Sequence, residues 1–229
     1  MDQTHTSYTG ISIQVSLSGY SFKVRIGDEV TTSGWLGAER IFTTPEFQRR
    51  YDQVDISLFT PKVTLVPESF FAPLSARAAL SEVCALEETD FVETIPVPSL
   101  ASVLVYSNSI GESLSKVLAQ TVLPPSGNPV RVLPEMYYLL CSLESLAEYN
   151  KIVASWRDGW LHLVIAQGKS LRLANVFQAP DFTTAEYFIF LCMKQLQLNP
   201  EVSTVCFRTP LESDAEMSLY RYFKAVVQL

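Results

Sequence analysis

Few residues of this chain have the types and spacing that catalysis or metal binding requires. The sequence has two histidines and four cysteines, with no Cys-x-x-Cys pair. His5 lies in a polar N-terminal segment, whereas His162 lies in an alternating segment, where we expect it to face solvent or a neighbour. No Gly-x-Ser-x-Gly, Gly-x-x-x-x-Gly-Lys or Gly-x-Gly-x-x-Gly motif occurs. We therefore predict no metal site and no catalytic residue.

The cysteines and the main acidic run have structural interpretations. Cys141, Cys192 and Cys206 lie in apolar surroundings and, with Cys84, are expected to be buried free thiols in a reducing compartment. Glu87-Glu88-Thr89-Asp90 falls in a predicted loop, so we expect it to form a solvated face.

The first half of the chain reads as a strand meander followed by alternating helices and strands. Alternation predicts strands over 11–17 and 22–26, with a turn at Ser18-Gly19, and Gly27-Asp28 then turns the chain into a third strand within 30–41. Thr43 and Glu46 have capping-box spacing. The remaining predicted elements are a helix over 43–59, a strand over 63–66 and a helix over 69–86.

The second half has the same predicted order. Strands are expected over 152–155, 161–166 and 171–177, with turns at Asp158-Gly159 and Gln167-Gly168. Thr183 and Glu186 repeat the capping box, and the helix that they begin ends before Pro200. A strand over 202–207 and a helix over 213–227 complete this half, which therefore lacks one strand.

A repeated phrase indicates duplication. Phe-Thr-Thr begins at position 42 and again at position 182, 140 residues later. The turn glycines recur at similar offsets (19 with 159, 27 with 168), as do the prolines that open strands (61 with 200). An isolated capping box could recur by chance, but it would not bring the glycines and prolines with it. We infer that one domain was duplicated.

The boundary between the halves is predicted from composition. Residues 101–106 are expected to be a fifth strand of the first unit, and Ser109-Ile110-Gly111-Glu112 is expected to cap a helix. Pro124 to Pro129 is rich in proline and glycine, as linkers are, and a helix is predicted from Glu135 to about Tyr149. The predicted division is a first subdomain over 1–123, a linker over 124–134 and a second subdomain over 135–229.

Composition narrows the class of protein. A chain of 229 residues can hold two small domains, and 48% hydrophobic with 18% charged residues favours packed elements over disorder. A net charge of −7 without a basic patch gives no support for nucleic-acid binding. The N-terminus does not resemble a signal peptide, and no apolar run reaches the roughly 20 residues of a membrane span. We expect a cytoplasmic protein.

The predicted order in each half, strand-strand-strand-helix-strand-helix with mixed sheets, resembles the ribonuclease H-like unit. Two tandem units, the second abbreviated, resemble the actin-like ATPase superfold of actin, sugar kinases, chaperones, and bacterial division and pilus-assembly proteins. Thr64-Leu65-Val66-Pro67-Glu68-Ser69-Phe70 resembles the Val-Pro-Ala-x-Phe stretch of the chaperone and division branches. Nearly the whole chain is similar to a family of uncharacterised proteins, mostly from Bacteroidetes, that share this fold.

The resemblance implies where nucleotide would bind. The first hairpin of each half should carry Asp-x-Gly, whose glycine lets amides approach phosphate and whose aspartate binds magnesium or its waters. With Gly19 as the first glycine the aspartate position is Leu17, and with Gly159 as the second it is Arg157. Neither side chain binds a divalent cation, and Asp158 is one position out of register, as a turn residue would be. Ser18, Gly19, Asp158 and Gly159 are therefore degenerate phosphate-turn positions.

The adenosine position is also altered. The superfold places a Gly-Gly pair after the fourth strand of its second half, where this chain has Phe207-Arg208-Thr209-Pro210-Leu211-Glu212. Side chains would fill the space that adenosine needs. Arg157 and Arg208 are candidates for anion binding in the cleft, and otherwise are exposed arginines at strand ends.

Three functions remain open. The first is a non-enzymatic protein with a degenerate nucleotide site and no cofactor, which acts through a protein partner or self-association. Its candidate surfaces are the Trp35 region and the last helix, where Met217, Tyr220, Phe223 and Val227 either form a surface or pack on the sheet. The alternative is a divergent nucleotide-binding ATPase or phosphotransferase that uses ATP and Mg. A membrane-surface scaffold is the third, although the last helix has only Arg221 and Lys224 as basic residues.

Overall fold

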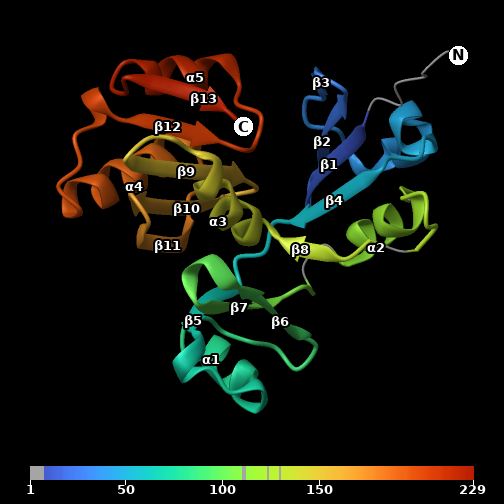
Figure 1. The fold of residues 1–229 in the computed structure, drawn as a ribbon, viewed down its shortest axis with the longest axis horizontal. Coiled ribbons are helices and arrows are strands. Elements are labelled where there is room, and N and C mark those ends of the chain that lie inside the picture. Colours follow the sequence, from blue (N-terminus) through green and yellow to red (C-terminus); the bar gives the residue numbers. More distant parts are fainter. Residues whose placement is uncertain (1–7, 110–111, 123, 129) are drawn as a thin grey trace, which may run out of the picture. The chain divides into compact units, whose positions relative to one another are not determined.

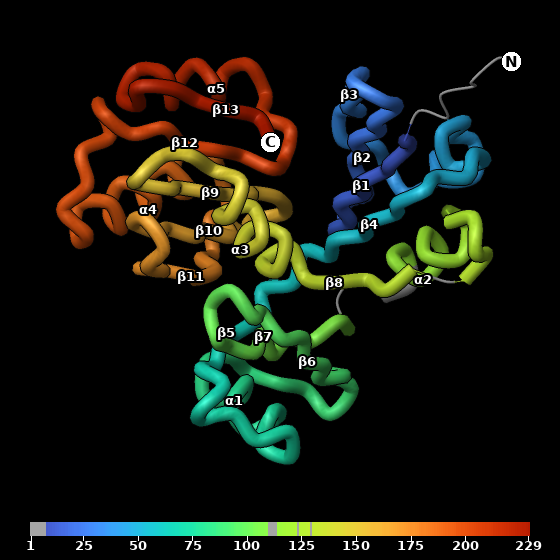
Figure 2. Tube along the Cα trace, viewed as in Figure 1, coloured from blue at the N-terminus to red at the C-terminus, as the bar shows by residue number. Residues whose placement is uncertain are grey.

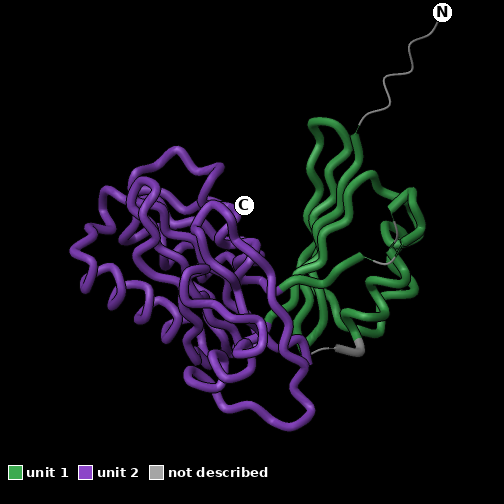
Figure 3. The backbone as a smooth tube through the Cα atoms, turned by 60° about the horizontal axis from the view of Figure 1, so that its bottom comes forward, with its two compact units in different colours: residues 1–59, 111–133 green, residues 60–110, 134–229 purple. Residues whose placement is uncertain are grey.

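The strand meanders predicted from alternation are present in both halves. The computed structural model describes residues 8–109, 112–122, 124–128 and 130–229. By internal contacts the chain divides into two units, the first comprising Met1–Phe59 and Gly111–Leu133 and the second comprising Thr60–Ile110 and Pro134–Leu229 (Figure 3). The predicted helix cap at 109–112 lies partly outside the described residues.

The first unit is built on a five-stranded mixed sheet in the order β3-β2-β1-β4-β8 (Figure 1). Strands β1 (Thr9–Ser16), β2 (Gly19–Ile26) and β3 (Glu29–Thr32) form the antiparallel meander. Strand β4 (Gln53–Leu58) runs parallel to β1, and β8 (Val132–Pro134) lies at the edge beside β4. Helix α2 (Glu112–Thr121) contributes Leu118 to a core that includes Ile13 and Ile56.

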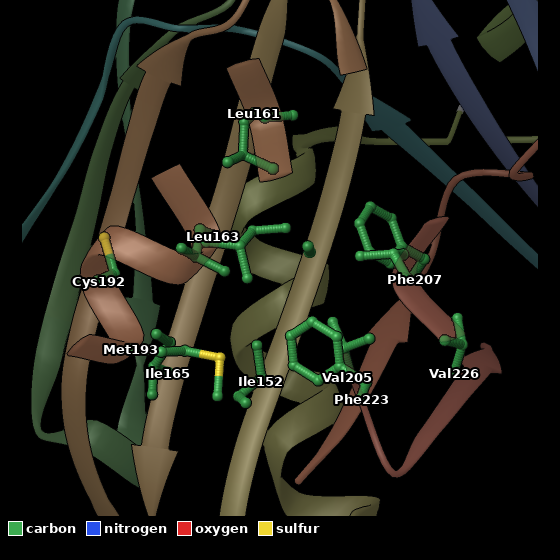
Figure 4. Packing of buried hydrophobic residues seen from close by; sticks show 14 of the residues in the cluster. Ile152, Leu161, Leu163, Ile165, Cys192, Met193, Val205, Phe207, Phe223 and Val226 are labelled. Carbon is green, nitrogen blue, oxygen red and sulfur yellow. The ribbon is translucent and has the colours of Figure 1, made fainter. Parts of the chain in front are cut away.

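The second sheet has the corresponding order, β11-β10-β9-β12-β13, and its first four strands run in the same relative directions as β3-β2-β1-β4. Its strands are β9 (Asn150–Arg157), β10 (Trp160–Gln167), β11 (Ser170–Gln178), β12 (Thr204–Phe207) and β13 (Ala225–Gln228). Helices α4 (Phe182–Gln195) and α5 (Ser213–Tyr220) pack on one face, where Ile165 of β10 lies beside Met193 of α4 (Figure 4). Because Ser155 alternates with Ala154, it faces the opposite side, which α3 (Glu135–Ser145) covers.

Residues 60–109 contain a small antiparallel sheet and helix α1 (Ala76–Ser81) (Figure 2). In the contact division they belong with the second unit. The order of this sheet is β5 (Val63–Pro67), β7 (Ser102–Ser107) and β6 (Val92–Val97), with α1 packed on Val105. This grouping differs from the division predicted over 1–123, 124–134 and 135–229. The segment 101–106 is a strand as predicted, but it pairs with β5 and β6, and β8 is the fifth strand of the first sheet.

Two helices predicted for the first half are wrong. The segment 43–59 follows a 3-10 helix that ends at Thr43, contains a second one (Pro45–Gln48) and then forms β4. Strand β4 forms because Val54, Ile56 and Leu58 alternate toward the core. Within 69–86 only Ala76–Ser81 is α-helical, since Pro73 begins a separate 3-10 turn.

The helix predicted over 213–227 is also wrong in its last part. Helix α5 stops at Tyr220 and residues 225–228 form β13, which pairs in parallel with β12. The second five-stranded sheet is therefore not abbreviated, and the two large sheets each have five strands in the same order. No helix among the described residues is long and apolar enough to cross a membrane.

The repeated Phe-Thr-Thr phrase does not form a capping box in either copy. Helix α4 is capped by Asp181, whose carboxylate accepts a hydrogen bond from Thr184 N at 2.7 Å. In the first copy the 3-10 helices have no side-chain cap, and Thr44 Oγ1 instead lies 2.7 Å from the hydroxyl of Tyr20. The two identical phrases thus form different local structures.

The acidic run 87–90 is not simply a solvated face, because Asp90 is buried. Its carboxylate accepts hydrogen bonds from Lys62 Nζ at 2.6 Å, Ser107 Oγ at 2.7 Å and the amide of Glu87 at 2.7 Å. Burial raises the pKa of Asp90, but these hydrogen bonds outweigh it and bring the pKa from 3.8 to about 2.

Asp90→Asn is therefore expected to lower the free energy of unfolding by about 2 kcal/mol in urea denaturation at neutral pH. The exposed neighbour Glu88→Gln is the matched control and should change it by less than about 0.5 kcal/mol. Since folding lowers this pKa, the contribution is present above pH 3.8 and is lost as the pH falls toward about 2. Equal stability of wild type and Asp90→Asn at neutral pH would contradict this assignment.

Candidate functional site

The predicted phosphate turn of the first unit packs closely against the backbone of Leu36. Leu17 and Ser18 form the two-residue turn between β1 and β2, and Gly19 begins β2 with φ of 143°. A Cβ atom at Gly19 would lie 2.0 Å from the carbonyl oxygen of Leu36. That carbonyl accepts a hydrogen bond from Tyr20 N at 2.9 Å. Glycine is required here because the Leu36 backbone crosses so closely.

The turn of the second unit carries a charged pair. Asp158 and Gly159 have φ of 50° and 77°, as a hairpin of the Asp-Gly type requires. Asp158 Oδ1 lies 3.5 Å from Nε of Arg157, the last residue of β9. Burial lowers the pKa of Arg157 below its ordinary value, and the carboxylates of Asp158 and Glu212 offset only part of this shift. The arginine therefore faces acidic neighbours within its own unit.

Strand register shows that the two turn glycines are not equivalent. Strands β1 and β9 begin at Thr9 and Asn150, and Gly19 takes the place in β2 that Trp160 takes in β10. Gly159 therefore corresponds to Ser18, so the offset between Gly19 and Gly159 is one residue out of register. Gly27 and Gly168, by contrast, occupy matching turns.

The loop after β12 is closed by side chains. Gln228 Nε2 on β13 donates hydrogen bonds to the carbonyls of Phe207, Arg208 and Thr209 at 3.0, 3.2 and 3.1 Å. Thr209 is buried, and its Oγ1 accepts a hydrogen bond from Trp156 N at 3.1 Å. The segment predicted to replace the Gly-Gly pair is thus tied to both neighbouring strands.

Arg208 enters a buried polar cluster that the sequence did not reveal. Its Nη1 donates to Glu135 Oε2 at 2.7 Å, and its guanidinium lies 4.9 Å from the ring centroid of Tyr138. Glu135, the first residue of α3, is completely buried, and its Oε1 accepts a hydrogen bond from Ser155 Oγ at 2.6 Å. Ser155 is also completely buried, so this cluster leaves no accessible nucleophile or general base.

His162 faces a neighbour, as predicted. Its side chain is fully buried, and Nε2 lies 3.0 Å from the carbonyl oxygen of Thr60. Burial lowers its pKa, although the Thr60 hydrogen bond and the charge of Glu135 act in the opposite direction. The imidazole is therefore neutral near pH 7.

The cysteines differ in exposure, and among the described residues the potential metal-ligating side chains are not grouped. Cys192 and Cys206 are buried, as predicted, but Cys141 is exposed on α3 because it points away from the sheet. Burial raises the pKa of Cys206 to about 11, and Glu148 adds to this. In the described part of the chain, no three His, Cys, Asp or Glu side chains are grouped as metal ligands would be.

Nearly the whole chain matches the model of one protein family. Residues 1–226 match the model of a family described as "Protein of unknown function (DUF3822)". The chain belongs to the DUF3822 family. No curated protein matches this DUF3822 chain at a significant level.

Solved structures similar to the DUF3822 chain establish its fold. A Bacteroides thetaiotaomicron protein with actin-like ATPase fold and unknown function is 18% identical with a TM-score of 0.67, covering 100% of this chain and 93% of that one. The type IV pilus biogenesis complex PilM–PilN gives 12% identity, a TM-score of 0.52 and coverages of 95% and 87%. The cytoplasmic domain of EpsL from Vibrio cholerae, an inner membrane component of the type II secretion system, is 14% identical with a TM-score of 0.51, covering 90% of this chain and 84% of that one. The fold is the predicted actin-like ATPase fold, with two ribonuclease H-like units.

Proposed function

We propose that this protein is a non-enzymatic member of the actin-like fold that acts through a protein partner or self-association. The observation that carries the proposal is the closed cluster of Glu135, Arg208 and Ser155. Its carboxylate is fully buried and engaged by an arginine and a hydroxyl, so it is not positioned to activate water or bind a magnesium ion.

The phosphate-turn positions support the same proposal. In the first unit Leu17 occupies the position where a magnesium-binding aspartate is expected, and Gly19 is explained by the crossing of Leu36 alone. In the second unit strand register matches Leu17 with Asp158, whose carboxylate already lies 3.5 Å from Nε of Arg157. The carbonyls of the loop after β12 are occupied by Gln228. Anion binding by Arg157 or Arg208 would compete with the carboxylates that already face them.

Similar structures support a partner-binding role. PilM is described in a complex with PilN, and EpsL is described as a component of a secretion system. In this chain the subdomain 60–110 exposes four large apolar side chains, which makes it our preferred partner surface: Phe70, Leu74, Val83 and Phe91.

The surfaces predicted from sequence are less suitable for a partner. Trp35 packs edge-on against Phe59 with a centroid distance of 6.2 Å. Of the four residues predicted near the end of the chain, Phe223, between α5 and β13, is buried, whereas Met217, Tyr220 and Val227 are exposed. We further propose that the shared strand order arose by internal duplication. We also propose that the protein is cytoplasmic, a location supported by its four cysteines, none of which forms a disulfide.

A thermal shift experiment separates this proposal from a divergent ATPase or phosphotransferase. Saturating ligand raises the melting temperature of any protein that binds it in the folded state. We expect about 5 mM Mg-ATP or Mg-ADP to leave the melting temperature unchanged relative to Mg-tripolyphosphate. A nucleotide bound with a Kd of about 50 µM would stabilise the fold by about 2.7 kcal/mol, a rise of roughly 5 °C or more. Such a rise would overturn the proposal.

A further inference from the structure

The second unit contains a pocket of about 350 Å³ whose lining includes none of the phosphate-turn residues or the members of the Glu135 cluster. Its apolar walls come from four parts of the unit: Leu100 after β6, Leu140 and Leu143 on α3, Ala166 on β10, and Leu171 on β11. Lys151 and Lys169 also line it. Its volume falls in the range of small-molecule sites.

The pocket exists because small residues occupy one end of the sheet. Ala166 lies directly opposite Lys151 in the β9–β10 pair, on the face that α3 covers. The pairing of β10 with β11 shifts register between Ile165 and Ala166, a bulge of the kind that redirects side chains beside binding sites. A larger residue at Ala166 would fill the space between the sheet and α3.

The outer wall is fixed by a constrained turn. Leu100 ends the 3-10 helix Pro98–Leu100, and the next residue, Ala101, has the left-handed conformation with φ of 44°. The Leu100 carbonyl accepts a hydrogen bond from Ser102 Oγ at 2.9 Å, and the Ala101 carbonyl accepts one from Glu68 N at 2.9 Å. These bonds hold Leu100 at the pocket, so the wall is formed before any ligand arrives.

The charges at the pocket favour an anion. Lys151 Nζ donates to the carbonyl of Leu143 at 2.5 Å, which holds the ammonium at the C-terminal end of α3. An ammonium has three donors, so this bond uses one of them. Lys169 is exposed in the β10–β11 turn, and Glu144 is the single carboxylate among the described lining residues. The lining therefore combines an apolar interior with a net positive charge.

We propose that this pocket binds a small amphiphilic carboxylate, such as a linear aliphatic acid. The chain would lie against Leu100, Leu140 and Ala166, and the carboxylate would pair with Lys169 and Lys151. The inference does not depend on the proposed function, because the pocket shares no residue with the phosphate-turn positions 17–19 and 157–159 or with the Glu135 cluster.

Titration calorimetry of the full chain with hexanoate, heptanoate and octanoate tests the proposal. We expect the affinity to rise about fourfold for each added CH2 group, because each buries apolar surface in the pocket. Octylamine has the same chain with a cationic head, and we expect no measurable binding. Absence of octanoate binding, affinity independent of chain length, or equal binding of octylamine would overturn the proposal.

Two variants place the site. Lys169→Gln should weaken octanoate binding about two- to fivefold, as loss of an exposed ion pair does. Lys194→Gln, the same change on α4 across the sheet, is the matched control and should bind as wild type. Ala166→Leu should weaken binding more than about tenfold by filling the pocket. If Ala166→Leu does not fold, the two lysine variants still test the location of the site. An equal loss of octanoate affinity in Lys169→Gln and Lys194→Gln would refute the assignment.

Discussion

Replacing Arg208 with leucine is expected to lower the free energy of unfolding by about 3 kcal/mol. The substitution leaves the carboxylate of Glu135 completely buried, still hydrogen-bonded to Ser155 but without the cation that neutralises it. Removal of one member of a buried ion pair costs more than the pair contributes, because the remaining charge is not solvated. It also removes the stacking of the guanidinium on Tyr138. Urea denaturation at pH 7 measures the effect.

The companion variants separate charge from packing. The double variant Glu135→Met with Arg208→Leu removes both charges and should recover most of the lost stability. Arg172→Leu, an exposed arginine on β11, is the matched control and should change stability by less than about 0.5 kcal/mol. If Arg208→Leu and Arg172→Leu were equally mild, the Glu135 cluster would not be the structural element described here.

Gly19→Ala is expected to cost about 3 kcal/mol or more. The new Cβ would lie 2.0 Å from the Leu36 carbonyl oxygen, and φ of 143° is a conformation that alanine rarely adopts. Relief would require breaking the paired hydrogen bonds between Tyr20 and Leu36. Urea denaturation again provides the measurement.

Gly34→Ala is the matched control for this prediction. A Cβ at Gly34 would have no neighbour within 4 Å, so its effect should stay below about 1 kcal/mol. Similar losses in the two variants would show that the approach of Leu36 does not explain Gly19. A selective loss would show that the glycine is needed for folding, with no phosphate required to account for it.

Local patterns predicted the hairpins well. The alternation in 11–17 and 161–166 and the turns at Gly27 and Gly168 fix both meanders, because period-two burial and positive φ are local properties. Strands that form only by pairing with distant segments were predicted as helices. Strand β4 forms because it pairs with β1, and β13 forms because it pairs with β12, and neither partner is adjacent in sequence.

The candidate site was only half predictable for the same reason. Arg208 could be identified from its place after a predicted strand, but its partner Glu135 lies 73 residues earlier. Nothing in the Leu133-Pro134-Glu135 stretch marks that glutamate as buried, and burial of a charge follows from tertiary contacts. Prediction therefore placed the loop after β12 correctly and missed what closes it.

Titration calorimetry of the full chain with Mg-ATP tests the central claim most directly. Three features together predict no heat of binding up to about 1 mM nucleotide: the buried Glu135–Arg208 pair, the Gln228-bound loop, and phosphate turns that carry Leu17 in one unit and an Asp158 paired with Arg157 in the other. Saturable binding with a Kd in the micromolar range would contradict the account of a degenerate nucleotide site.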